Sequence, residues 1–379
     1  MRASLYAATA PPPLSLRVVH VTQQLKSGGA ETLLRGLCAG LTATGIDASV
    51  VSVYDDALTA SEREALGFPS RSVGRHGRGD VAFFPRLVAL LRTLRPDVVH
   101  AHLHAGKYAG RFAALAARVP AIVFTEHGDE AGGAVRAAVN RFLDPRTTRF
   151  VTFSETQRAA LALRAGISVD RVAVIPNGIA EPPRADRRRL RAELGLADDS
   201  LALFMPARFS EQKNQALALR AFATLAAERP AWRMFFAGKG PLEDAMRALA
   251  AELGIATRTV FLGFRDDAPL LGRAMDAFVM PSLWERMPLA LGEAMRAELP
   301  VVTTPWDGVV DFVRDGETGI VASNFSVEAF ARALRTLSDA ETRVRISRAA
   351  HAFADERFDL GQSVRGHVEL YRSICAAPR

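Results

Sequence analysis

The 379-residue sequence has little cysteine and no long hydrophobic segment. Its two cysteines, Cys38 and Cys375, lie far apart in helical patterns, which excludes a disulfide framework and fits a reducing compartment. No run of 18 apolar residues occurs, so no membrane-spanning helix is expected. With 49% hydrophobic and 23% charged residues the composition is that of a globular protein, and the length favours two domains.

Lysine is scarce as well, since only four of the 48 basic residues are lysines. The formal net charge is +7, but the arginines are spread along helical segments, which argues against nucleic acid as a partner. A basic surface of this kind suits a phosphorylated substrate or anionic lipid. We therefore expect a cytoplasmic protein that can make peripheral contact with an anionic membrane at the inner face of the plasma membrane.

Short apolar runs alternate with longer amphipathic stretches, which predicts an α/β fold of parallel strands covered by helices on both faces. The first series of predicted strands is 16–22, 48–54, 97–102, 121–127, 149–154 and 171–176. The second series is 201–208, 233–238, 259–263, 277–281, 300–304 and 319–322.

Residues 177–189, between the two series, are rich in proline and charge, which is typical of a linker. We therefore predict two doubly wound, Rossmann-like domains, at 1–180 and 181–360, that face a cleft. Ligands of such sheets bind beyond the carboxyl ends of the strands, so functional motifs should follow strands.

The loop after the first strand contains Gly28 and Gly29 just before a predicted helix. A glycine pair there lets backbone N–H groups approach a phosphate or a sugar, although a purely structural turn explains it equally well. The G-x-G-x-x-G pattern of dinucleotide-binding domains is absent from this loop.

Histidines follow two other strands of the first series. His100, His102 and His104 alternate, so they share one face only if the strand continues, and no cysteine or carboxylate nearby completes a metal-ligand set. Hydrogen bonds to loops are therefore the preferred interpretation, and we predict no metal site. His127, followed by Gly128, ends another strand, where its ring and backbone could meet a substrate.

In the second series, Arg208 ends a strand and Lys213 lies five residues later, before a predicted helix. Two cations near a positive helix end form an anion clamp, of the kind that the charge on a leaving diphosphate needs. A surface pair between Arg208 and Glu211 is the alternative.

The stretch PSLWERMPLALGEAM, residues 281–295, follows another strand and carries two acids. Pro288 suits a helix start, so Glu285 should lie in the loop and Glu293 about a turn and a half into the helix. Carboxylates accept hydrogen bonds from hydroxyls, as a ribose or a sugar ring requires. Two acids, two cations and a helix end together predict a nucleotide-sugar site.

From about residue 16 to residue 375 the chain resembles retaining GT-B glycosyltransferases of the glycogen-synthase-like group, family four. The resemblance rests on GGAE, HAH followed by glycine, TEHG, IPNGI, ARFSEQKN, AGKGPLE and the Glu285–Glu293 unit, in this order and spacing.

The resemblance implies residue roles. Arg208 and Lys213 match the pair that contacts the donor diphosphate, Glu285 the acid beside the donor sugar, Glu293 the acid on the ribose, and His127 the histidine over the transferred sugar. Gly28 and Gly29 match the loop under the donor phosphates. It also implies that the last helix, 361–379, packs on the first domain, which takes the acceptor, and that the second domain binds the donor.

The motif departs from the family pattern at two places. Arg286 stands where glycine is common, and because Pro288 has no N–H, sugar contacts through backbone amides rest on Arg286 and Met287. Asp311 stands where relatives often have glutamate. These departures concern the identity of the donor sugar.

The predicted function is retaining, metal-independent transfer from a nucleoside diphosphate sugar to a hydroxyl of a glycan or lipid-linked acceptor, in bacterial surface polysaccharide synthesis, with no cofactor. Catalytic residues are His127, Arg208, Lys213 and Glu285. The alternatives are a nucleotide-sugar epimerase, a pyridoxal-phosphate phosphorylase, a nicotinamide oxidoreductase and a non-catalytic binding protein of the same fold.

Overall fold

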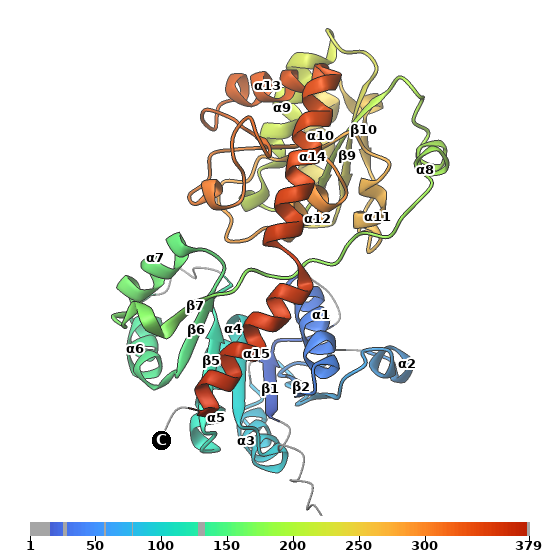
Figure 1. Ribbon diagram of the computed structural model, residues 1–379. Helices are drawn as coiled ribbons and strands as arrows, with labels where there is room; N and C mark the ends of the chain where they lie inside the picture. The colour runs from blue at the N-terminus through green and yellow to red at the C-terminus, as the bar shows by residue number, and fades with distance from the viewer. Residues whose placement is uncertain (1–15, 26–28, 57, 78, 128–132, 377–379) are drawn as a thin grey trace, which may run out of the picture. The chain divides into compact units, whose positions relative to one another are not determined.

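The computed structural model describes residues 16–25, 29–56, 58–77, 79–127 and 133–376, and it contains two parallel sheets (Figure 1). The chain divides into two compact units. The first comprises Met1–Thr152, Leu161–Ala173 and Val364–Arg379, and the second Phe153–Ala160 and Val174–Ser363. Each unit therefore contains segments that are distant in the sequence.

The first unit is built on a seven-stranded sheet with the strand order β3-β2-β1-β4-β5-β6-β7. Its strands are β1 (Arg17–Thr22), β2 (Asp47–Ser52), β3 (Ser70–Ser72), β4 (Val98–His102), β5 (Ala121–Thr125), β6 (Arg149–Thr152) and β7 (Val172–Val174). Its helices are α1 (Gly29–Ala43), α2 (Ala60–Glu64), α3 (Phe83–Leu94), α4 (Leu103–Ala105), a π-helical turn (Gly106–Gly110), α5 (Arg111–Ala116), α6 (Ala134–Leu143) and, from Leu161 onward, the end of α7 (Glu155–Ala165), whose first part belongs to the second unit.

The second unit has a six-stranded sheet with the order β10-β9-β8-β11-β12-β13. The strands are β8 (Leu201–Pro206), β9 (Trp232–Ala237), β10 (Thr259–Phe261), β11 (Ala277–Met280), β12 (Val301–Thr303) and β13 (Ile320–Val321). The helices are α8 (Arg187–Glu193), α9 (Gln215–Ala226), α10 (Glu243–Glu252), α11 (Ala268–Gly272), α12 (Leu289–Arg296), α13 (Val327–Arg335), α14 (Ala340–Arg357) and the start of α15 (Leu360–Ala376).

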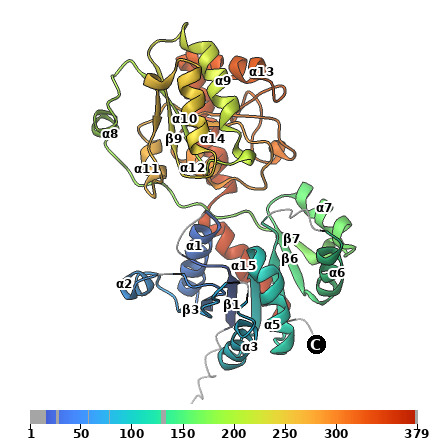
Figure 2. The ribbon, with the colours of Figure 1, turned by 180° about the vertical axis from the view of Figure 1, so that it is seen from behind.

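Both sheets confirm the predicted doubly wound α/β class. The central strands β1, β4, β5, β8 and β11 are buried along nearly their whole length, because helices cover both faces. In the first unit, α1 packs against α15, whose Val364 lies where a Cβ on Gly40 would be. The rear view shows α3 and α5 on the other side of this sheet (Figure 2).

All twelve predicted strands are present, and β3 is an additional one. Its sequence, Ser70–Ser72, is polar and half-exposed at the sheet edge, so it carries no apolar signal. The predicted linker 177–189 is wrong at its end, where α8 begins at Arg187. Asp186 caps this helix by accepting hydrogen bonds from the N–H groups of Arg188 and Arg189.

A buried arginine holds the start of the second unit against its sheet. Arg191 on α8 is 6% exposed and donates to the carbonyl oxygens of Ala197, Ser200 and Ala274 and to Asp276 Oδ2 at 2.6–3.1 Å. The same carboxylate accepts the N–H of Ala202 at the start of β8. Arg191 therefore satisfies three backbone carbonyls and one charge at once.

We expect Arg191→Met to lower the free energy of unfolding of the second unit by about 2–3 kcal/mol, because it leaves buried acceptors unpaired. Tryptophan fluorescence during urea unfolding reports this transition selectively, since Trp232, Trp284 and Trp306 all lie in the second unit. Arg189→Met, which removes an exposed pair with Glu193, is the control and should change stability by less than about 0.5 kcal/mol. Equal effects of the two substitutions would contradict this role of Arg191.

Candidate active site

The predicted cations lie at the point of the second sheet where the strand order reverses, between β8 and β11. Ligands of doubly wound sheets bind beyond the strand ends at this point. After β8 the chain turns through Glu211–Lys213 and Asn214, which has a left-handed φ of 49°, into α9. Gln215 Nε2 donates to the Arg208 carbonyl at 2.9 Å, which fixes the backbone beneath the Arg208 side chain.

The Arg208 side chain is exposed. Within the described residues no hydrogen bond or ion pair engages its guanidinium, and the alternative pair with Glu211 is not formed. Lys213, by contrast, is paired: its Nζ lies 2.5 Å from Glu285 Oε1. The structure thus brings together one predicted diphosphate ligand and one predicted sugar ligand.

Glu285 is buried and held by three side chains. Besides Lys213, Ser282 Oγ donates to Oε1 at 2.6 Å and Gln212 Nε2 to Oε2 at 3.4 Å. Sequence reasoning missed Ser282, whose position three residues before Glu285 in the same loop was the available signal. Because three donors surround its carboxylate, Glu285 is oriented where the loop after β11 meets the loop after β8.

These two loops are also joined through their backbones. The N–H of Leu283 donates to the Gln212 carbonyl at 2.8 Å, and Gln212 Nε2 donates to the Trp284 carbonyl at 2.9 Å. Displacing either loop would therefore displace both the cations and the acid.

A third loop, after β9, supports the Arg208 loop by close backbone contact. A Cβ on Gly240 would lie 2.2 Å from the Phe209 carbonyl oxygen, and one on Gly238 would overlap the carbonyl of Ala207. The N–H of Phe209 donates to the Lys239 carbonyl at 3.2 Å. Only glycine allows this approach, and the Lys239 side chain is exposed.

Glu293 lies on α12, which begins at Leu289 with Pro288 in the N-cap position, one residue earlier than a first-turn proline. It lines a small pocket whose other walls are apolar, among them Phe204, Phe278 and Leu299. Burial raises the pKa of Glu293 to about 6. An acid in such surroundings gains from accepting hydroxyl hydrogen bonds, which favour its ionised form.

Of the residues that depart from the family pattern or stand beside such a departure, Arg286 and Met287 directly follow Glu285 in the loop after β11. The Arg286 carbonyl accepts from Gln157 Nε2 at 2.5 Å, and the buried Met287 sulfur lies 3.3 Å from the N–H of Asn177. Asp311 ends a 3-10 turn, and its buried Oδ2 has no hydrogen-bond partner in the described part of the chain.

In the first unit, Gly28 lies outside the described residues and Gly29 is the first residue of α1. His127 follows β5, and its Nε2 lies 3.3 Å from His102 Nδ1. Burial, with a smaller contribution from His367, lowers the pKa of His127 to about 4, so its ring is neutral at pH 7. A neutral ring can donate one hydrogen bond to a sugar hydroxyl without adding charge.

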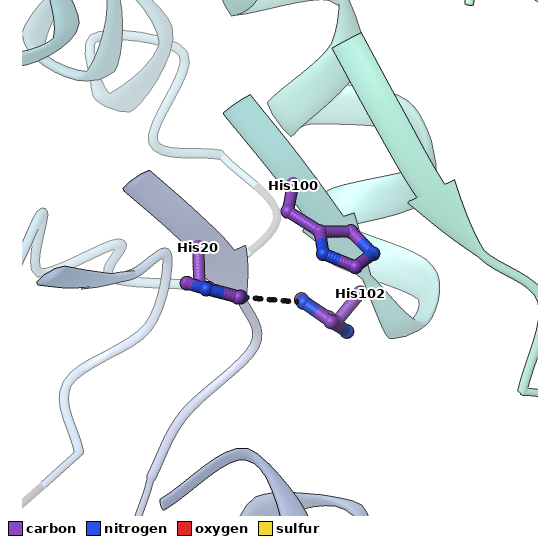
Figure 3. Close-up of side chains that lie close together, drawn as sticks. All are labelled: His20, His100 and His102. Atoms are coloured by element: carbon purple, nitrogen blue, oxygen red, sulfur yellow. Dashed lines mark hydrogen bonds between the residues drawn. The ribbon is translucent and has the colours of Figure 1, made fainter. Parts of the chain in front are cut away.

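The alternating histidines do not share one face. Leu103 has a left-handed φ of 54°, so β4 ends at His102, and His104 instead packs against the Tyr108 ring. His20 completes the cluster with His100 and His102, because it pairs with His100 across β1 and β4 (Figure 3). His20 Nδ1 and His102 Nε2 are 2.9 Å apart.

The cluster of His20, His100 and His102 has nitrogens close enough for one metal ion. However, both nitrogens of His100 are engaged, by the Tyr371 hydroxyl at 2.6 Å and by Thr125 Oγ1 at 2.7 Å. A metal would have to displace one of these bonds and enter a site without a carboxylate. The contacts therefore favour a hydrogen-bonded cluster over a metal site. The sequence predicted loops as the hydrogen-bond partners of these histidines, but the observed partners lie mainly on β1, β5 and α15.

Comparison with known proteins gives a consistent result for both halves of the chain. A family model described as "Glycosyltransferase Family 4" matches residues 27–181, and one described as "Glycosyl transferases group 1" matches residues 186–353. Glycogen synthase of Mycobacterium tuberculosis is 30% identical, and the aligned region covers 74% of this chain and 69% of the synthase.

Two further similarities bear on substrates and fold. The UDP-Gal:alpha-D-GlcNAc-diphosphoundecaprenol alpha-1,3-galactosyltransferase of Escherichia coli is 28% identical over 67% of this chain and 69% of its own. The crystal structure of HepE from Anabaena, solved with UDP and glucose, superposes with a TM-score of 0.83 at 24% identity, covering 94% of this chain and all of that one.

Proposed function

Because the chain belongs to the GT-B glycosyltransferases of family four, we propose that it transfers a sugar from a nucleoside diphosphate sugar to a hydroxyl of a glycan or lipid-linked acceptor, with retention at the anomeric carbon. The observation that carries the proposal is the junction of Arg208, Lys213 and Glu285 at the reversal of the second sheet. The family assignment leaves the epimerase alternative without support.

The chemistry follows from charge. Cleavage of the glycosyl–phosphate bond leaves negative charge on the diphosphate, which Arg208 and Lys213 neutralise. The Lys213 ammonium has three donors, so it can keep Glu285 and still donate to a phosphate oxygen. Glu285 and Glu293 accept hydroxyl hydrogen bonds, and the role proposed for His127 is to donate one.

Retention fits a reaction on one face of the sugar. A retaining hydrolase uses one of two carboxylates as nucleophile. Here Glu285 is engaged by Lys213 and Ser282, so it is better suited to binding than to attack. The acceptor hydroxyl then forms the new glycosidic bond as the bond to the diphosphate breaks, and its proton passes to the departing diphosphate.

The test is a screen of UDP-, GDP-, ADP- and dTDP-sugars by thermal shift, followed by NMR of the product with a lipid-linked diphosphate sugar or a glycan. A ligand at a hundred times its Kd raises stability by about 2.7 kcal/mol. Product with the donor's anomeric configuration supports the proposal. Inverted product, or donor converted without any acceptor, would overturn it.

We further propose that the reaction needs no metal, because Arg208 and Lys213 supply the positive charge. Activity should persist in excess EDTA. Loss of activity that magnesium or manganese restores would contradict this prediction. As a control for residual metal, protein dialysed against chelator should be as active as undialysed protein.

No helix in the described part of the chain is long and apolar enough to cross a membrane. A lipid-linked acceptor would nevertheless bring the protein to a membrane surface, and α6 offers Val135, 78% exposed, and Phe142, 45% exposed, next to Arg141 and Arg146. We expect sedimentation with phosphatidylglycerol vesicles and not with phosphatidylcholine, with less binding by Val135→Asp/Phe142→Asp. Equal binding to both vesicles would contradict the electrostatic part.

A further inference from the structure

His20, His102 and His127 form a continuous hydrogen-bonded chain in the first unit (Figure 3 draws its first link). His20 Nδ1 lies 2.9 Å from His102 Nε2, and His102 Nδ1 lies 3.3 Å from His127 Nε2. His20 is fully buried and His102 is 5% exposed, and the rings of these two stack with centroids 5.2 Å apart. Neither residue has a role in the chemistry described above.

The protonation of the three rings is coupled. Burial lowers the pKa of His20 to about 3 and that of His102 well below its ordinary value, so both are neutral. A neutral imidazole has one donor nitrogen and one acceptor nitrogen. His102 must therefore donate to one neighbour and accept from the other, which leaves only two arrangements for the chain.

The two arrangements differ in which ring nitrogen of His20 and of His127 carries the hydrogen. If His102 donates to His20, then His127 donates from Nε2 and His20 carries its hydrogen on Nε2. If His20 donates from Nδ1, then His102 donates from Nδ1 to His127 Nε2, and His127 carries its hydrogen on Nδ1.

The environment of His20 favours the second arrangement. Its Nε2 is buried and has no hydrogen-bond partner in the described structure. Buried N–H groups without a partner are rarer than under-satisfied acceptors, because the donor loses its hydrogen bond to water entirely. A bare Nε2 on His20 is therefore preferred, and with it the Nδ1–H form of every ring in the chain.

We propose that His20 and His102 are positioning residues that hold His127 in the Nδ1–H form. What this tautomer does for a bound sugar rests on the proposed function. The tautomer itself depends only on the three rings.

The tautomer is measured directly by two-dimensional 1H–15N NMR of the full chain labelled with 15N-histidine, with His127→Asn, His102→Asn and His20→Asn spectra used for assignment. We expect His127, His102 and His20 all as the Nδ1–H form. His127 predominantly in the Nε2–H form would overturn the proposal, whether or not the protein transfers sugar.

A matched pair of variants tests the transmission. His20→Leu removes the donor at the end of the chain, whereas His20→Asn replaces Nδ1–H with an amide N–H at a similar distance from the backbone. In His20→Leu, the Nδ1–H to Nε2–H ratio of His127 should fall about fivefold, the equivalent of one lost hydrogen bond, and His20→Asn should restore it. An unchanged ratio in folded His20→Leu, judged by circular dichroism, would overturn the proposal.

The same labelled samples test the alternative that the histidine cluster is a metal site. Addition of equimolar zinc chloride should leave the three rings' signals in place. If the signals of His20, His100 and His102 shift together, the cluster is a metal site and the relay is wrong. With a donor identified, His20→Leu should lower kcat more than it raises the donor KM, and His20→Asn should recover it. A rise in KM alone would contradict a role for the tautomer in transfer.

Discussion

Arg208→Ala is expected to lower kcat/KM about a hundredfold or more, equivalent to about 3 kcal/mol of transition-state stabilisation. The guanidinium is exposed and makes no described hydrogen bond or ion pair, so its removal should change the free energy of unfolding by less than about 0.5 kcal/mol. Activity and stability therefore separate at this residue. Steady-state kinetics with the identified donor and urea unfolding followed by tryptophan fluorescence measure the two effects.

Lys213→Met provides a useful contrast. It removes the other cation but also leaves the buried Glu285 without its ion-pair partner, so it should lower both activity and stability. Arg220→Ala, at an exposed position on α9, is the matched control and should do neither. Near wild-type turnover by Arg208→Ala would contradict the assignment of Arg208 to diphosphate binding.

Acid should unfold the first unit well before the second. In the first unit, burial holds the pKa of His20 at about 3 and of His127 at about 4, and those of His100 and His102 well below the ordinary value. In the unfolded chain all four titrate near 6.5, so below that pH the unfolded state binds protons that the folded state does not. Stability present above pH 6.5 is therefore lost as the pH falls toward 4.

The expected size is large. Each proton taken up on unfolding lowers stability by about 1.4 kcal/mol per pH unit, so four give about 5 kcal/mol per unit near pH 5. Hydrogen exchange of β4 and β5 amides reports the first unit, and tryptophan fluorescence reports the second. The second unit contains Glu293, whose raised pKa gives the opposite pH dependence. The stability that this group contributes is present at low pH and is lost as the pH rises through about 6.

His20→Asn removes one of the four titrating rings. It should therefore reduce the pH dependence of the first unit's free energy of unfolding by about one proton, or about 1.4 kcal/mol per pH unit. Parallel loss of both units' stability between pH 6.5 and 5, or an unchanged slope in this variant, would contradict the assignment of the titration to these rings.

The sheets could be predicted because their strands are apolar on both faces, and this signal is local. β3 could not, since three polar residues at a sheet edge give no periodicity. The α8 start was misassigned for a related reason: Arg187–Arg189 resemble a charged linker, and the helix depends on the Asp186 cap and on the burial of Arg191, a contact with residues about 80 positions away.

The candidate site shows the same division. Motif spacing placed Arg208, Lys213 and Glu285 beyond strand ends and Glu293 inside the following helix, and they lie there. That Lys213 and Glu285 form a pair depends on β8 and β11 being neighbours, which the order of strands along the chain does not reveal. His20 was missed for this reason too, because only the pairing of β1 with β4 brings it to His100.

The course of α15 has a consequence for dissecting the protein. This helix begins in the second unit, and from Val364 onward it belongs to the first, where the Tyr371 hydroxyl bonds to His100 Nδ1. A fragment that stops near residue 180 would expose the surface of α1 that Val364 packs against and leave the buried His100 imidazole without its Tyr371 partner. Such a fragment should fold only when a peptide spanning the C-terminal helix is supplied in trans.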